Sequence, residues 1–262
     1  NITVEMTGGQ LYGSIFGGGR LAMTGISYNG VINTSTSEGS YQALLNGPDH
    51  GQVFVKVSGG TVGNLAKMRD CDYSIGDVFG GGKGNKVGIA GHPASSATLI
   101  SLVKDTHVEI SGTARIYGSV YGGGEVSNVG NFTWNQSGAN VSNIAIASGT
   151  GHTKVTVSGG TIGMDNMQMI TASGYPDDWG HVFGGCEGWV EKLTDSPVVD
   201  TEGNRLVELM ASVGTTEVTI KDNAFVLGSV YGGADNGHVL DSTYVAIKGG
   251  QIGAGNQVFN EG

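Results

Sequence analysis

The chain has 262 residues, of which 49 are glycine and four are proline, and its formal net charge is −10, with 13 basic against 23 acidic residues. Glycine is far above its usual share of about 7%, but it follows no strict triplet, which excludes collagen. The basic residues are scattered and no stretch approaches the roughly 20 apolar residues of a membrane span, so we expect no nucleic-acid partner and no membrane insertion by this segment.

Two phrases alternate along the chain. The first is a run of alternating apolar residues ending in a small turn: ITVEMTGG from Ile2, VFVKVSGG from Val53, THVEISGT from Thr106, TKVTVSGG from Thr153, TEVTIKDN from Thr216 and TYVAIKGG from Thr243. The second is a β-branched residue and an aromatic residue followed by glycines: IFGGG at Ile15, VFGGG at Val78, VYGGG at Val120, VFGGC at Val182 and VYGGA at Val230. Six copies of one arrangement indicate a repeat architecture.

The apolar residues of the first phrase recur at period two, which predicts a strand with one buried face. We therefore expect one inward column of equivalent residues: Val57, Ile110, Val157, Ile220 and Ile247. Paired glycines after these strands predict sharp corners, because glycine takes positive φ without steric cost. The aromatic residues of the second phrase are expected to stack from copy to copy: Phe16, Phe79, Tyr121, Phe183 and Tyr231.

Short strands separated by glycine or polar corners predict an all-β chain with very little helix. The fold expected is a right-handed parallel β-helix, a solenoid of about six coils starting near residues 2, 53, 106, 153, 216 and 243, with long loop inserts on one side. Residues 1–262 form a single β-solenoid in this interpretation, and the ends without polar caps suggest a segment of a longer protein. A β-propeller is the alternative, but the copy from Val218 to Val245 is too short for a four-stranded blade.

All three tryptophans lie in the inserts between the phrases, and several tyrosines join them. Flat amphipathic side chains suit sugar rings and protein partners, so the candidate ligand-binding residues are Trp134, Trp179, Trp189 and Tyr175. The alternative is that these residues form small hydrophobic clusters within the inserts. Exposure of the indoles distinguishes the two.

Catalytic chemistry has weak support in the sequence. Small acidic groups such as Asp70, Asp72 and Asp77 would suit glycoside hydrolysis, but they sit in polar inserts without a matching set of basic residues. We assign no catalytic residue, no metal ligand and no cofactor, because no zinc, EF-hand or nucleotide-binding pattern is present. Cys71 and Cys186 are interpreted as unrelated thiols, with a disulfide as the alternative.

The recurring pattern VxVxGGxIGxVYGGG resembles the glycine-rich β-helical repeats of large bacterial surface and adhesin-like proteins. The resemblance covers essentially the whole chain and implies secretion, a cell-surface location, and binding or spacing in place of catalysis. The expected function is therefore a non-enzymatic extracellular or cell-surface scaffold whose inserts recognise a glycan or a surface protein. The expected further partners are neighbouring repeats of the same polypeptide or other copies in end-to-end self-association. The alternative is a polysaccharide lyase or glycoside hydrolase on the same scaffold.

Overall fold

The computed structural model describes residues 1–20, 22, 24, 38–42, 51–64, 75–84, 101–130, 132–137, 140–146, 148–163, 180–188 and 211–253. Strands and turns make up these residues, and no helix occurs among them. No helix in the described ranges therefore has the length and apolarity needed to cross a membrane.

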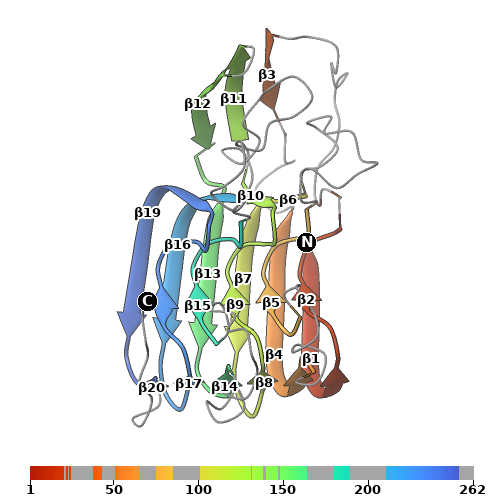
Figure 1. The fold of residues 1–262 in the computed structure, drawn as a ribbon, viewed down its shortest axis with the longest axis vertical. Coiled ribbons are helices and arrows are strands. Elements are labelled where there is room, and N and C mark those ends of the chain that lie inside the picture. The colour runs from red at the N-terminus through yellow and green to blue at the C-terminus, as the bar shows by residue number, and fades with distance from the viewer. Residues whose placement is uncertain are drawn as a thin grey trace, which may run out of the picture.

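The largest sheet contains ten strands in parallel pairing. Six of them carry the first repeated phrase and lie side by side in chain order across Figure 1: β1 (Ile2–Leu11), β4 (Gln52–Val62), β7 (Asp105–Ile110), β13 (His152–Val157), β16 (Ser212–Ile220) and β19 (His238–Ile247). The other four follow the corners: β8 (Arg115–Ile116), β14 (Thr161–Ile162), β17 (Phe225–Val226) and β20 (Gln251–Ile252). Equivalent residues are partners, so Ile2 pairs with Val53 and Val53 with Thr106.

Three smaller sheets complete the described structure. The aromatic phrases form a five-stranded parallel sheet of β2 (Ile15–Phe16), β5 (Val78–Phe79), β9 (Val120–Tyr121), β15 (Val182–Phe183) and β18 (Val230–Tyr231). A two-stranded parallel sheet joins β6 (Leu102–Val103) to β10 (Asn128–Val129). The third sheet is antiparallel and contains β3 (Glu38–Gln42), β11 (Phe132–Ser137) and β12 (Asn140–Ile146), which stand together above β6 and β10 in Figure 1.

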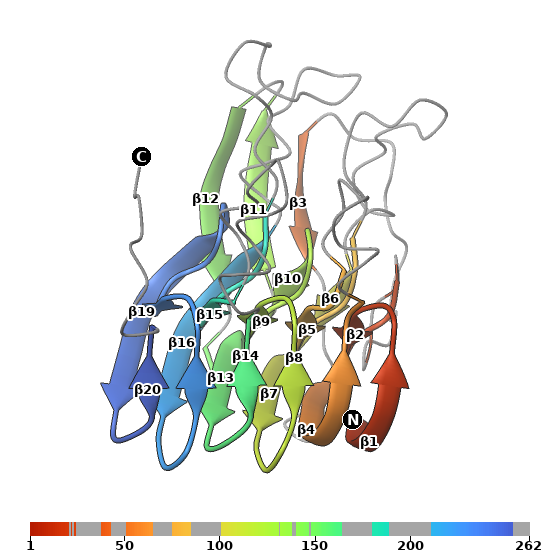
Figure 2. The same cartoon turned by 60° about the horizontal axis from the view of Figure 1, so that its bottom comes forward.

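The expected right-handed parallel β-helix of about six coils is wrong, although the chain is all-β with parallel strands. A regular β-helix would place one strand of every coil in each of several separate sheets. Instead, ten strands form one curled parallel half-barrel, whose two limbs meet at the glycine corners in Figure 2. The physical reason is β4, which passes through its corner at Gly60 (φ 84°) without a break and pairs with β7 before it and with β8 after it. The β-propeller alternative requires four-stranded antiparallel blades, and none occurs among the described residues.

The apolar core lies inside the curl of the large sheet. Valine and isoleucine supply most of it, because branched side chains pack well on a pleated surface. The predicted inward column is confirmed for Val57, Ile110, Val157 and Ile220, which are partners in successive strands and fully buried. Ile247 continues the register but is 53% exposed, because β19 is the outermost strand at that edge.

The second glycine of each aromatic phrase allows close approach between copies. A Cβ atom on Gly123 would lie 2.2 Å from Cys186 Sγ, whereas one on Gly233, in the same column at the outer edge, would meet nothing within 4 Å. We expect Gly123→Ala to lower the free energy of unfolding by about 1 to 3 kcal/mol, because copies three and four must move apart. Gly233→Ala is the matched control and should change it by less than about 0.5 kcal/mol in urea titrations. Equal losses in both variants would contradict this account.

Candidate functional site

An aromatic column runs along the five-stranded sheet, separate from the apolar core. Its rings are nearly parallel, with centroids 4.7 Å apart for Phe16 and Phe79, 4.8 Å for Phe79 and Tyr121, and 5.0 Å for Tyr121 and Phe183. Tyr231 ends the column, 4.8 Å from Phe183. The predicted aromatic stack is thus confirmed. The three middle rings are buried and Tyr231 is 44% exposed, so Tyr231 offers the widest surface among the described rings of the column.

A polar column precedes these rings in the chain. Its members occupy the position just before each aromatic phrase: Ser14, Asp77, Ser119, His181 and Ser229. Each side chain accepts a hydrogen bond from the backbone amide of the next member. Ser14 Oγ accepts from Asp77 N (3.1 Å), and Asp77 Oδ1 accepts from Ser119 N (2.6 Å). Ser119 Oγ then accepts from His181 N (3.1 Å), and His181 Nδ1 accepts from Ser229 N (2.8 Å).

The polar column contains serine, histidine and aspartate, which are also the residue types of nucleophilic catalysis. That chemistry requires a base aimed at the hydroxyl and a third group that orients the base. Here Asp77 Oδ1 and His181 Nδ1 receive backbone N–H groups, which ties successive copies together. These hydrogen bonds therefore describe a structural column. Asp77, the one described member of its acidic group, is buried within it.

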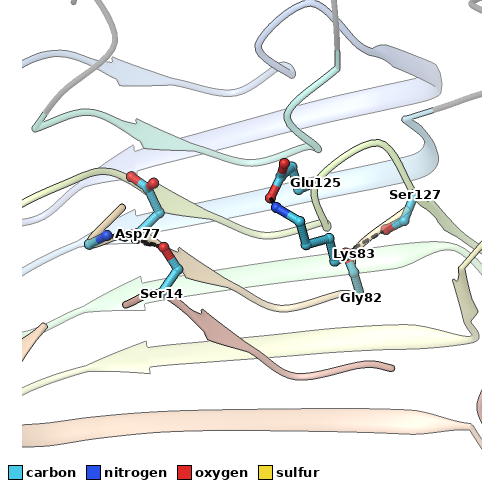
Figure 3. A network of polar contacts seen from close by, with 7 residues as sticks. Ser14, Asp77, Gly82, Lys83, Glu125 and Ser127 are labelled. Atoms are coloured by element: carbon cyan, nitrogen blue, oxygen red, sulfur yellow. Dashed lines mark hydrogen bonds and ion pairs between the residues drawn. The ribbon is translucent and has the colours of Figure 1, made fainter. Parts of the chain in front are cut away.

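A charged column follows the glycines. Its members are bridged in parallel from copy to copy: Arg20, Lys83, Glu125, Glu187 and Asp235. Lys83 Nζ forms an ion pair with Glu125 Oε2, whose side chain is 6% exposed, and also lies 5.3 Å from the centroid of the Phe16 ring. Figure 3 shows this pair together with the hydrogen bond that the Asp77 backbone amide donates to Ser14 Oγ. The column is basic at the β2 end of the sheet and acidic at the β18 end.

Serine and threonine hydroxyl groups donate further hydrogen bonds to glycine carbonyls. Ser127 Oγ donates to Gly82 O (3.0 Å), as Figure 3 shows, and Ser101 Oγ donates to Gly19 O (2.8 Å). Buried threonines also donate to glycine carbonyls, Thr106 Oγ1 to Gly122 O and Thr153 Oγ1 to Gly184 O, each at 2.5 Å. The serine bonds link residues of different copies and hold the register of the stack, whereas each threonine bond joins the first phrase of a copy to the aromatic phrase of the same copy.

The polar and charged columns were not predicted from the sequence, although they flank the repeated aromatic phrases. A signal for them is present in the sequence: the residue before each aromatic phrase is polar, and the residue after each phrase is charged, basic in the first two copies and acidic in the other three. Among the described residues no group of three or more histidine, cysteine, aspartate or glutamate side chains is arranged to hold a metal ion.

The predicted ligand-binding residues belong to the inserts, and the structure reaches one of them. Trp134 lies in β11, where its backbone is the partner of Tyr41 in β3. Two inserts far apart in the sequence are thereby joined in one sheet. Trp179, Trp189 and Tyr175 lie outside the described residues, as do Asp70 and Asp72 of the acidic group.

Cys186 occupies the third glycine position of the fourth aromatic phrase. It is a free, fully buried thiol whose Sγ donates to Ser127 O at 3.1 Å. Burial raises its pKa to about 12, because the thiolate would lose its hydration. Cys186 is thus not part of a disulfide, in agreement with the interpretation of two unrelated thiols, and Cys71 lies outside the described residues.

The outer face of the large sheet carries a mixed column. Phe54, His107, Lys154 and Glu217 are partners in successive strands, and Lys154 Nζ lies 2.9 Å from Glu217 Oε1. The ring centroids of Phe54 and His107 are 6.1 Å apart. Burial lowers the pKa of His107 below its ordinary value of 6.5. The positive charges of Lys154 and Lys56 lower this pKa further, whereas the negative charges of Glu109 and Glu217 raise it.

The lowered pKa of His107 makes stability depend on pH. The unfolded chain binds the proton more readily than the folded chain, so the free energy of unfolding should fall as the pH drops from above 6.5 through the folded pKa. We expect His107→Gln to flatten the urea-measured stability profile in this window. Parallel profiles for the variant and the parent chain would assign the pH dependence to other groups.

Comparison of the chain with models of known protein families, with curated proteins and with solved structures finds no match. The resemblance to glycine-rich surface proteins therefore stays a prediction from the repeated phrases.

Proposed function

We propose that this chain is a non-enzymatic extracellular or cell-surface scaffold or adhesin segment, and that its inserts recognise a glycan or a protein. The stacked copies serve as the scaffold. The proposal is supported by the uses of the polar groups in that stack, where a carboxylate, hydroxyls and an imidazole accept or donate hydrogen bonds between copies. Polar groups used in this way stabilise the framework and are not arranged to attack a substrate.

The single observation that carries the recognition role is the pairing of β11 with β3. It brings Trp134 of one insert opposite Tyr41 of another, at the backbone level, in a sheet separate from the core. Tryptophan and tyrosine carried by paired strands suit sugar rings and protein hot spots, because both residue types are large and amphipathic. The proposed site residues are Trp134, Trp179, Trp189 and Tyr175, with Tyr41 added by this pairing.

The test is a glycan and protein array probed with the 262-residue chain, followed by titration of any ligand found. Trp134→Ala and Tyr41→Ala should each weaken binding at least about tenfold, because aromatic anchors dominate such surfaces. Thr133→Ala, the neighbour of Trp134 in β11, is the matched control and should bind like the parent chain. Thermal unfolding of all three should be measured alongside. Loss of binding only together with loss of folding would contradict a recognition role.

The competing enzyme function has its own readout. The same chain is incubated with acidic and neutral polysaccharides, and new reducing ends and unsaturated sugar products are measured. We expect no release above a buffer control. Release that Asp70→Asn or Asp72→Asn abolishes would replace the scaffold proposal with a lyase or hydrolase.

A further inference from the structure

The β19 edge of the stack exposes apolar residues whose equivalents in the interior copies are buried. In the interior copies Val218, Ile220 and Val226 are fully buried. Their partners in the outermost strands, Val245, Ile247 and Ile252, are 40%, 53% and 39% exposed. The aromatic column ends at the same edge with Tyr231. These positions are shaped to receive another copy of the repeat.

The opposite edge, at β1 and β2, has the matching shape. Val4, Met6 and Leu11 of β1 occupy the register of the interior valines and pack against the core from one side. The two edge phrases turn at the same kind of corner, MTGGQL at one end and IKGGQI at the other, with φ of 86° at Gly9 and 83° at Gly250. Figure 1 places β1 and β19 at opposite ends of the sheet. A second β1 would therefore fit beside β19 as a further parallel strand.

The two edges also carry opposite charge. The charged column begins with Arg20, which is exposed, and ends with Asp235, which is partly exposed. Placing one chain after another brings Asp235 of the first next to Arg20 of the second, and it brings Tyr231 next to Phe16. Turning two β19 edges toward each other would instead place Asp235 of each chain at one junction, where like charges repel.

We propose that this chain associates head to tail with further copies of itself, β19 and β18 of one chain pairing in parallel with β1 and β2 of the next. The apolar residues of the β19 edge become buried against Val4, Met6 and Leu11. Among the described strands, β1 and β19 each pair with one neighbour in the long limb of the sheet, so the backbone groups on their other side would gain partners in the assembly. Because the two surfaces differ, the contact is heterologous and does not end at a dimer. The proposal is independent of the recognition role of the inserts.

The first test is sedimentation velocity of the 262-residue chain over a concentration series, at about 0.15 M salt so that repulsion between net-negative chains is screened within about 8 Å. We expect species that grow past the dimer as concentration rises. Ile247→Lys should raise the dissociation constant at least about tenfold, because the ammonium group would have to be buried at the junction. Thr156→Lys, on the outer face of β13 in the middle of the stack, is the matched control and should associate like the parent.

The second test exchanges the charges at the junction. Asp235→Arg alone and Arg20→Asp alone should each weaken association, whereas an equimolar mixture of the two variants should recover it as an alternating assembly. If Ile247→Lys does not fold, recovery of association in the mixture still tests the proposed contact. The proposal is overturned if the parent chain stays monomeric, if assembly stops at dimers, if Ile247→Lys and Thr156→Lys associate equally, or if the mixture does not recover.

Discussion

Val157→Asp should lower the free energy of unfolding by about 4 kcal/mol or more, because a carboxylate in the apolar core loses its hydration without gaining a partner. Val157 is fully buried between Ile110 and Ile220, its register partners on either side. Since small domains are stable by only about 5 to 15 kcal/mol, a loss of this size removes a large share of the free energy of unfolding. The measurement is a urea titration followed by circular dichroism.

Thr156→Asp is the control for this prediction. Thr156 is next to Val157 in β13 but points to the outer face, so the new carboxylate stays hydrated. We expect a loss of about 1 kcal/mol or less, mainly from the weaker strand preference of aspartate. A comparable loss in both variants would mean that the inward column does not form the core.

Tyr121→Ala should lower the free energy of unfolding by about 3 to 5 kcal/mol, the usual cost of removing a buried aromatic side chain. The Tyr121 ring is 2% exposed and stacks on Phe79 on one side and Phe183 on the other. Its loss leaves a cavity and breaks two aromatic contacts that contribute about 0.5 to 1.5 kcal/mol each within that total. Urea titrations with intact m values would measure the change.

Two comparisons make the aromatic prediction specific. Tyr231→Ala removes the same side chain from the exposed end of the column and should cost only about 1 to 2 kcal/mol, since one face of the ring is already open. Tyr121→Phe keeps the ring and should retain most of the stability, as Phe79 and Phe183 occupy the equivalent positions. Equal losses at Tyr121 and Tyr231 would show that stacking between copies contributes little.

The columns explain why so regular a stack tolerates varied side chains. Each position needs a group that can bond to the next copy, but serine, aspartate and histidine all do so in the polar column. The residue type likewise varies along the charged column, from arginine and lysine to glutamate and aspartate, while the backbone bridges between copies are kept. Variation along the columns therefore changes the surface of each edge without changing the register.

The candidate site was only partly predictable. The sequence places Trp134 and Tyr41 in inserts, and the inserts carry no repeated phrase from which a partner could be inferred. Their pairing through β11 and β3 joins segments that are distant along the chain. Local composition holds no information on which of several polar inserts will pair.

Local patterns by themselves determined the strands, their buried faces and their corners. The alternation around Val157 and the paired glycines at Gly60 depend on backbone and side-chain preferences within a few residues, and repetition made equivalent residues identifiable. The tertiary structure decided how the strands divide into sheets. β4 bends at Gly60 without ending, so both of its limbs enter one curled half-barrel in place of separate sheets. That outcome depends on hydrogen bonds to two different strands, and the alternation of apolar residues in the sequence does not indicate which strands will pair.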